Sequence, residues 1–488
     1  MKKLLLLTFL ILTLFLFACS PQAEDDYNLP GEEETADYGE MPSEIFEEAY
    51  TEYFEPVLDY EMVEIEGVMR RIMPPGSLTI EHFLEDLDYM VYVLENNFAL
   101  LNVAYWAHGI DYMELAGNAR QHILAMEYPC EDAFRAKVVY SFMPLFYTGH
   151  FNILGHISFW RELRDNYWNR RHVGMMKFEL MQSPLAQRFY EPDVQQRQYR
   201  IDRNNAEHQR LTEKYGPTLN RFFAEGAFSQ PLTMEIIEEG RVAYLSTGVH
   251  MSDIGRYRHR IFSFYGEITD FEHLIIDLRD NAGGLIDYFL DFILRPHLNE
   301  AIDSPEAFIF FMDGSYNRRF NDFLFESTIG HGLVLTEPHR MAHEVVEEYY
   351  LPEINHADIE RMHFGSPAVR RVSGITPNTR QFGNEPAFGG KIWVLTGPTM
   401  GSASQLAAWY AKETGFATLV GDITGGNYGG DRILALMPNT GIAFRFDSLY
   451  ITDSRGRPLE AGTIPHYFNR PGMDALETVL ELIAEGGY

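Results

Sequence analysis

Three segments in the first third of the chain place apolar residues at the three- and four-residue spacing of an amphipathic helix. The first, TIEHFLEDLDYMVYVLENNFALL, starts at Thr79 and aligns Phe83, Leu87 and Leu94 on one side. DYMELAGNARQHILAM and EDAFRAKVVYSFMPLF repeat the pattern. Together they predict an N-terminal helical domain over residues 51–155.

A different pattern begins at Arg241, where short apolar runs alternate with longer helical segments. RVAYLST, HLIIDLR, KIWVLT and FATLVGD are predicted strands, and SDIGRYRHRIFSFYGEI, LIDYFLDFIL and SASQLAAWYAKE are predicted helices. RILALMP, GIAFRF and SLYITD are typical of hairpin strands, and MDALETVLELIAEG is a predicted final helix. Because this alternation requires crossover connections, it predicts an α/β (α+β) core with a mixed, largely parallel sheet over residues 236–488. A variable insertion interrupts this core at about residues 300–388, and residues 156–235 have mixed periodicity that indicates no particular fold.

The chain starts with MKKLLLLTFLILTLFLFACS, which joins two lysines to a long uncharged apolar run. This pattern is typical of a secretory signal, and the run is short for the alternative, a relaxed membrane span. Its end, Leu16-Phe17-Ala18-Cys19, resembles a bacterial lipobox. The resemblance predicts a lipoprotein signal peptide over residues 1–19, lipidation at Cys19, and an extracytoplasmic lipoprotein of the bacterial cell membrane.

The charge of the chain is strongly unbalanced, with 71 acidic residues against 39 basic ones and a net charge of −32. Nucleic acid is therefore not an expected partner, because phosphate binding needs a basic surface. Residues 20–50 contain many acids and no lysine or arginine, which predicts a solvated, flexible tether between lipid and folded body. The only cysteine besides Cys19 is Cys130, so lipidation of Cys19 leaves no partner for an intramolecular disulfide.

Ser402 is the main candidate for chemistry because it lies between the predicted strand KIWVLT and the predicted helix SASQLAAWYAKE. Reactive groups in such sheets gather at the carboxyl ends of strands, where helix N-termini present unpaired N–H groups. The local sequence Met400-Gly401-Ser402-Ala403-Ser404 lacks the G-x-S-x-G of the α/β-hydrolase elbow. A simple helix N-cap is the alternative role for Ser402.

Three stretches in this order resemble the tail-specific, or C-terminal processing, serine peptidase family. HLIIDLRDNAGG resembles its strand and turn, TGPTMGSASQLAAW its nucleophile segment, and ATLVGDITGG the strand that follows. The resemblance covers about residues 241–300 and 389–468 and implies a core of ClpP/crotonase-like type with Ser402 as the nucleophile. The bacterial processing peptidases pair this serine with a lysine, but the corresponding segment here reads GGNYG. No lysine follows Lys412, which lies too far along the helix to reach Ser402, so a Ser-Lys dyad is excluded.

Because a serine hydroxyl is a weak nucleophile, another residue must act as its base. The tricorn-like branch of the same family uses a histidine on a turn after the N-terminal helices. PLFYTGHFNILGHIS places His150 at that turn, with Thr148 where the branch has aspartate. The resemblance therefore implies that His150 is the base, and His156 is the alternative.

The same branch holds its histidine with a carboxylate from a segment resembling Leu-Glu-Gly-x-Gly-Ile-x-Pro-Asp. GRPLEAGTIPHYF presents Glu460 at the glutamate of this segment, and His466 replaces the final aspartate. The resemblance implies that Glu460 orients His150 and offsets the charge of the imidazolium. Asp447 and Asp453 are competing candidates for this role.

The predicted oxyanion hole consists of the N–H of Ala403 and a second N–H from the Gly283-Gly284 turn, because glycine permits positive φ and a close approach of the substrate. An ordinary strand-to-helix turn is the alternative for these glycines, and a dinucleotide loop is disfavoured because G-x-G-x-x-G is absent. Gln405 stands where the family usually has glutamate, and it keeps the size of that side chain without its charge.

These residues predict a secreted, lipid-anchored serine endopeptidase of the tricorn-like branch that hydrolyses peptide or protein substrates. No cofactor or metal is expected, because the sequence contains no HExxH motif, Cys/His cluster or Walker loop. Two other classes stay open. One is a catalytically inactive, peptide-binding lipoprotein, and the other is an envelope scaffold whose core only positions partners.

Overall fold

The computed structural model describes residues 62–65, 68–71 and most of residues 76–190, 232–318 and 334–486. Gaps within these ranges lie at residues 128, 157, 160–161, 164–176, 178, 249–250, 252–256, 299–300, 305, 370, 373–387 and 428–431. The predicted signal peptide with Cys19, the predicted tether and residues 191–231 lie outside the described residues. None of the helices within these ranges is both long and apolar enough to span a membrane.

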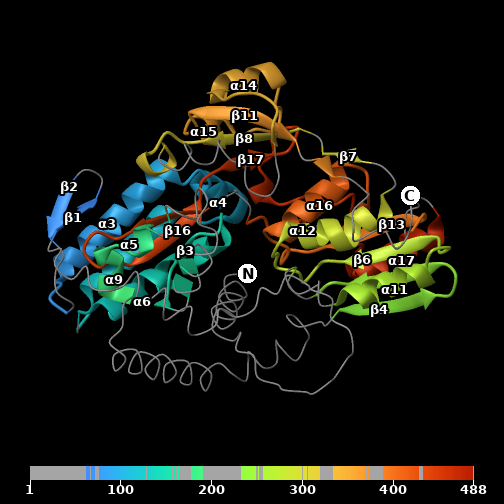
Figure 1. The fold of residues 1–488 in the computed structure, drawn as a ribbon, viewed down its shortest axis with the longest axis horizontal. Helices are drawn as coiled ribbons and strands as arrows, with labels where there is room; N and C mark the ends of the chain where they lie inside the picture. The colour runs from blue at the N-terminus through green and yellow to red at the C-terminus, as the bar shows by residue number, and fades with distance from the viewer. Residues whose placement is uncertain are drawn as a thin grey trace.

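The described residues form an arch of three parts (Figure 1). Helices α3 to α6 and a small sheet lie on one side, a larger sheet with its helices lies on the other, and a third sheet with α14 and α15 lies above both. Two large apolar clusters account for most of the buried side chains. We call the cluster around Phe98, Phe151 and Phe444 the first core, and the cluster around Ile276 and Leu406 the second core.

The helical side of the arch confirms the helices expected from periodicity. It contains α3 (Ile80–Asn97), α4 (Leu101–His108), α5 (Tyr112–Leu124), α6 (Glu131–Phe142), a 3-10 helix (Met143–Tyr147) and α9 (Pro184–Tyr190). A short hairpin of β1 (Met62–Ile65) and β2 (Val68–Arg71) precedes them. The side of α3 that carries Phe83, Leu87 and Leu94 is buried in the first core, as its spacing predicts.

A three-stranded antiparallel sheet packs against these helices, in the order β15 (Arg432–Leu436), β16 (Ala443–Asp447) and β3 (Asn152–Ile153). The turn between β15 and β16 is anchored to α3, because the buried Asp86 carboxylate accepts hydrogen bonds from the N–H groups of Asn439 and Thr440, at 2.7 and 2.8 Å. This anchor holds the turn from which β16 starts. The other end of β16 carries part of the site described below.

The larger sheet confirms the predicted mixed, largely parallel core. Its strand order is β18 (Tyr467–Phe468), β14 (Thr418–Gly421), β13 (Lys391–Thr396), β6 (His273–Asp277), β5 (Val242–Ser246) and β4 (Thr233–Glu238). All neighbours are parallel except β4 and β5. Its helices are α11 (Arg258–Glu267), α12 (Ile286–Phe289), α16 (Ala403–Glu413) and α17 (Ala475–Glu485), and α12 continues through a π-helical turn (Leu290–Leu294) into a 3-10 helix (Arg295–His297).

The two faces of this sheet are covered by different helices, because successive side chains of a strand point to opposite sides. On β6 and β13, Ile276 and Val394 pack with α16 in the second core. Ile275 and Trp393, one residue earlier on each strand, pack with α17 in a separate cluster. Both faces are thus buried, which is why these strands read as continuous apolar runs.

The region expected to be variable forms the third sheet, which the sequence did not reveal. Strands β10 (Arg340–Met341), β11 (Phe364–Val369), β8 (Ala307–Phe311) and β17 (Tyr450–Thr452) lie in this order, with β9 (Val334–Leu335) paired to β11. The same region holds α14 (Ala342–Tyr349), α15 (His356–Ile359), and the pair β7 (Ile302–Asp303) and β12 (Arg371–Val372). Strand β17 therefore pairs with β8 and not with the β15–β16 hairpin beside it in sequence.

Strand β8 joins the two cores because both of its faces are buried. Phe308 and Phe310 belong to the first core, whereas Ile309 and Phe311 belong to the second. The third sheet therefore holds the two sides of the arch together.

His297, in the 3-10 helix that follows α12, is buried, and neither of its ring nitrogens has a hydrogen-bond partner. Its ring lies against Tyr265, with 4.5 Å between the ring centroids. Burial lowers the pKa of His297 to about 3, whereas a histidine of an unfolded chain has a pKa of about 6.5. Between these two values the unfolded state binds a proton that the folded state does not bind, so the free energy of unfolding falls as the pH falls through this window.

We therefore expect His297→Phe to reduce the acid sensitivity of the fold. The histidine alone removes about 2 kcal/mol of the free energy of unfolding between pH 7 and pH 5, and phenylalanine has no proton to bind. Urea unfolding of both proteins at the two pH values measures the difference. Equal losses in wild type and variant would show that His297 binds no additional proton on unfolding.

Candidate active site

Ser402 lies in a tight turn between β13 and α16 and has a backbone conformation that few side chains adopt. Its φ is 54° and its ψ is −121°, a combination that costs about 1–3 kcal/mol for a residue other than glycine. The turn is held by a hydrogen bond of 3.0 Å from the N–H of Ser402 to the carbonyl of Gly426. Although Ser402 occupies the N-cap position of α16, its hydroxyl makes no capping hydrogen bond. The simple N-cap role is therefore wrong, and the hydroxyl is available for chemistry.

His150 meets this hydroxyl from the other side of the arch. It lies between the 3-10 helix that follows α6 and strand β3, also with a positive φ, of 49°. Its Nε2 is 3.0 Å from the Oγ of Ser402. The structure thus brings the predicted nucleophile and the predicted base into hydrogen-bond contact although 252 positions separate them in sequence.

Asp447, at the end of β16, holds the other nitrogen of the imidazole. Its two carboxylate oxygens lie 2.8 and 3.0 Å from the Nδ1 of His150, and its side chain is fully buried. The ladder between β16 and β3 pairs Phe444 with Ile153 and Arg445 with Asn152. Continued by two residues, the same register brings Asp447 opposite His150. The Ser402 hydroxyl, the His150 imidazole and the Asp447 carboxylate form a continuous chain of the kind that activates a serine.

The resemblance implies that Glu460 holds His150, but the carboxylate that contacts the imidazole is that of Asp447, one of the two competing candidates. Glu460 is fully buried in the 3-10 helix Leu459–Ala461. Its carboxylate accepts a hydrogen bond from the N–H of Gly149, at 3.1 Å. Glu460 therefore contacts the turn one residue before His150 and stabilises its backbone, whereas Asp447 contacts the imidazole itself.

The other candidates, His156 for the base and Asp453 for the orienting carboxylate, make contacts outside the site around Ser402. The Nε2 of His156 is 3.2 Å from the carbonyl oxygen of Phe189. Asp453 accepts hydrogen bonds from the N–H groups of Arg455 and Arg457, which close its own loop.

Of the three N–H groups predicted for the oxyanion hole, one already has an acceptor. The N–H of Gly283 donates to the Oδ1 of Asn281 at 2.9 Å and is therefore not free to bind an oxyanion. Within the described part of the chain, the N–H groups of Gly284 and Ala403 have no acceptor. Gly283 still has a role, because it lies directly against the nucleophile turn. An added Cβ would come within 2.7 Å of the carbonyl oxygen of Gly401 and 2.8 Å of the Cβ of Ser402.

Gln405, in the first turn of α16, acts as a buried structural amide. Its Nε2 donates to the carbonyl of Leu459 and to the hydroxyl of Thr463, both at 3.0 Å, and its Oε1 accepts from the hydroxyl of Thr424. The amide thus joins the start of α16 to the loops that contain Thr424 and Thr463, and its NH2 group donates two hydrogen bonds that a carboxylate could not donate.

A second charged group lies on the same face of β16 as Asp447. Arg445, two residues earlier, forms an ion pair with Glu162. Burial raises the pKa of Glu162, but Arg445, Arg432 and Lys177 outweigh burial and lower it to about 2. Glu162 is therefore a carboxylate at neutral pH and neutralises part of the positive charge near the site.

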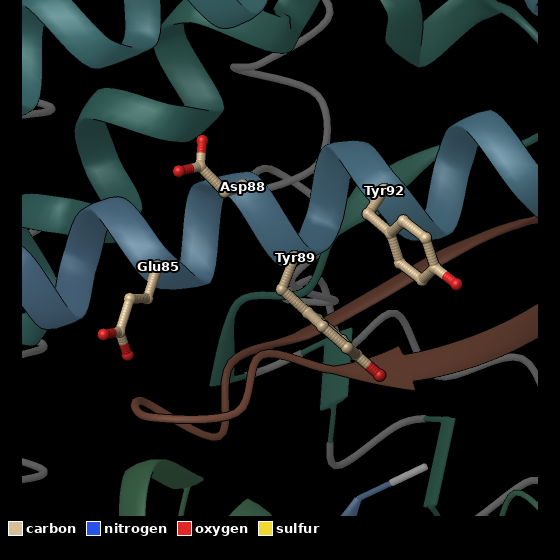
Figure 2. Close-up of a pocket in the computed structure, with 4 residues that line it drawn as sticks. All are labelled: Glu85, Asp88, Tyr89 and Tyr92. Atoms are coloured by element: carbon tan, nitrogen blue, oxygen red, sulfur yellow. The ribbon is translucent and has the colours of Figure 1, made fainter.

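A pocket of about 360 Å³ lies on α3 and is lined by Glu85, Asp88, Tyr89 and Tyr92 (Figure 2). Asp88 pairs with Arg120, and the hydroxyl of Tyr89 is 2.8 Å from that of Tyr316. None of its lining residues belongs to the site around Ser402. Among the described residues, three or more His, Cys, Asp or Glu side chains do not gather anywhere in a way that could hold a metal ion.

A serine beside the largely parallel sheet, in contact with a histidine that is held by a carboxylate from the antiparallel sheet, forms a hydrolase-like site. The comparison with known families gives the particular class. Residues 246–468 match the model of peptidase family S41. The match includes Ser402 and Asp447, whereas His150 lies before it. The predicted resemblance to the tail-specific peptidase family is therefore confirmed.

Solved structures resemble the chain only loosely. Mature CPAF is 13% identical with a TM-score of 0.45, over 84% of this chain and 99% of that one. A lipoprotein from Streptococcus agalactiae is 10% identical with a TM-score of 0.38, over 86% and 99% of the two chains. The photosystem II D1 C-terminal processing protease is 14% identical with a TM-score of 0.30, over 52% of each. No curated protein matches the sequence.

Proposed function

We propose that this protein is a serine endopeptidase in which Ser402 is the nucleophile, His150 the general base and Asp447 the orienting carboxylate. The observation that carries the proposal is the continuous contact from Ser402 through His150 to Asp447, with distances of 3.0 and 2.8 Å. The contact of histidine with the serine supports a relation to the tricorn-like branch of the peptidase family, with aspartate in place of the glutamate of that branch.

The reaction begins when the Nε2 of His150 takes the proton of the Ser402 hydroxyl and the Oγ attacks the peptide carbonyl. The N–H groups of Gly284 and Ala403 stabilise the negative charge on the carbonyl oxygen, each by about 3 kcal/mol. His150 then gives its proton to the leaving amine as the C–N bond breaks. In the second half, His150 takes a proton from water, the hydroxide resolves the ester, and Ser402 recovers its proton.

A fluorophosphonate probe tests this proposal, because it reacts only with an activated serine. We expect the full chain, purified in detergent, to be labelled. Ser402→Ala should abolish labelling, and His150→Ala should slow it by about three orders of magnitude. His156→Ala is the matched control and should react like wild type. A folded wild-type protein that is not labelled would contradict the proposal and favour a peptide-binding relative without activity.

We further propose that the peptidase acts outside the cytoplasm, held to the membrane by a lipid on Cys19 and separated from it by the acidic segment of residues 20–50. The lipobox-like sequence before Cys19 supports this proposal. Cys19→Ala should move the protein from the membrane fraction to the soluble fraction, and a variant that stays with the membrane would contradict lipid anchoring at this cysteine.

A further inference from the structure

The loop that follows β14 contacts the backbones of both reacting residues at adjacent positions. The carbonyl of Gly426 accepts the hydrogen bond from the N–H of Ser402, at 3.0 Å. The side-chain Oδ1 of Asn427, the next residue, accepts a hydrogen bond from the N–H of His150, at 2.8 Å. The loop is itself held to the nucleophile turn, because the N–H of Gly425 donates to the carbonyl of Met400 at 2.7 Å.

Backbone strain is concentrated at the same place. Four residues other than glycine have a positive φ in the described part of the chain, and three of them are Ser402, His150 and Asn427. Asparagine is among the residues that tolerate this conformation best. Strain of this kind persists only where surrounding contacts impose it, and it gathers at functional sites. The three residues are linked by hydrogen bonds, because His150 bonds to Asn427 through its N–H and to Ser402 through its Nε2.

The nucleophile and the base of the catalytic chain adjoin different apolar cores. Ser402 adjoins Ala403 of the second core, and His150 adjoins Phe151 of the first. The hydrogen bond from His150 to Asn427 joins the base to the loop that also holds the nucleophile. Of the side chains suited to positive φ, glycine offers no acceptor and aspartate adds a negative charge, so asparagine is the one that supplies a neutral acceptor.

We infer that Asn427 is a positioning residue for the proposed reaction. The side chain of Asn427 accepts the hydrogen bond from the N–H of His150. Gly426, the preceding residue, accepts the hydrogen bond from the N–H of Ser402. Asn427 therefore fixes the backbone of the base relative to the nucleophile. The role of Asn427 in catalysis rests on the proposed function. Its effect on the position of His150 does not, because it depends only on the hydrogen bond between them.

Two substitutions separate the acceptor from the backbone conformation. Asn427→Gly keeps the positive φ and removes the acceptor, whereas Asn427→Asp keeps an acceptor of the same shape. Tyr350→Gly is the matched control, because Tyr350 has a φ of 46° and its side chain is 80% exposed. We expect Asn427→Gly to lower kcat for a peptide ester by about 100-fold with KM within about two-fold, since misplacement of a catalytic group acts on the chemical step. Asn427→Asp should recover kcat to within about five-fold of wild type, and Tyr350→Gly should not change it.

Crystal structures of wild type and both Asn427 variants give a readout that does not depend on activity. We expect the contact between the Nε2 of His150 and the Oγ of Ser402 in wild type and Asn427→Asp, and its loss in Asn427→Gly. If wild type neither hydrolyses the ester nor reacts with the fluorophosphonate, the proposed function fails, and the structures alone decide the role of Asn427. An unchanged contact or an unchanged kcat in Asn427→Gly would overturn the inference, as would an equal loss in Asn427→Gly and Asn427→Asp.

Discussion

Asp447→Asn should lower kcat/KM by roughly four orders of magnitude while the protein stays folded. The amide has nearly the size of the carboxylate, but it does not stabilise the imidazolium that forms when Ser402 loses its proton. Its NH2 group can also donate a hydrogen bond to the Nδ1 of His150, which a carboxylate cannot do, and so favours the wrong tautomer of His150. Steady-state hydrolysis of a peptide ester, together with the rate of fluorophosphonate labelling, measures the loss.

Glu460→Gln is the matched comparison, because the glutamine oxygen still accepts the hydrogen bond from the N–H of Gly149. We expect it to lower kcat/KM by less than about ten-fold, as for the change of a single hydrogen bond. If Glu460→Gln were as damaging as Asp447→Asn, Glu460 would regain the role that the sequence alone assigned to it.

Gly283→Ala should also abolish most of the activity, by about two orders of magnitude in kcat/KM. The φ of Gly283 is 114°, and the added methyl group would meet the carbonyl oxygen of Gly401 and the Cβ of Ser402. To avoid this contact the nucleophile turn must move, and with it the N–H of Ala403, whose alignment is worth about 3 kcal/mol.

The control for this substitution is Gly472→Ala. Gly472 has a φ of 81°, but an added Cβ would have nothing within 4 Å. It therefore shows the cost of a positive φ without the clash, about 1 kcal/mol of folding free energy. Thermal unfolding and hydrolysis should be measured for both variants. Equal activity in Gly283→Ala and Gly472→Ala would show that the turn around Ser402 accommodates the added methyl group without displacing the nucleophile.

The elements of the core could be predicted because each depends on local sequence. The apolar runs of β6 and β13 and the spacing in α3 are visible within single segments, and the structure has them within a few residues of the predicted ranges. The third sheet was missed because β8 and β17 pair across about 140 positions, and no local pattern indicates which strands will meet.

The same reason explains why the sequence did not show which carboxylate contacts His150. Ser402 and His150 stand at turns that the family resemblance marks. The choice between Asp447 and Glu460 depends on the register of β16 against β3, which is set by the pairing of Phe444 with Ile153 and not by the residues near either acid. For Gly283 a local signal was present, because an asparagine two residues before a glycine often accepts the N–H of that glycine in an Asx-turn.

The division of the catalytic residues between two apolar cores has a consequence for the life of the chain before it is mature. Each core consists of segments from distant parts of the sequence, and β8 contributes to both. A nascent or partly unfolded molecule that has formed only one core has a serine without its base, or a base without its serine. Such a molecule lacks the contact between the Oγ of Ser402 and the Nε2 of His150, so the proposed active site is assembled only when folding is complete.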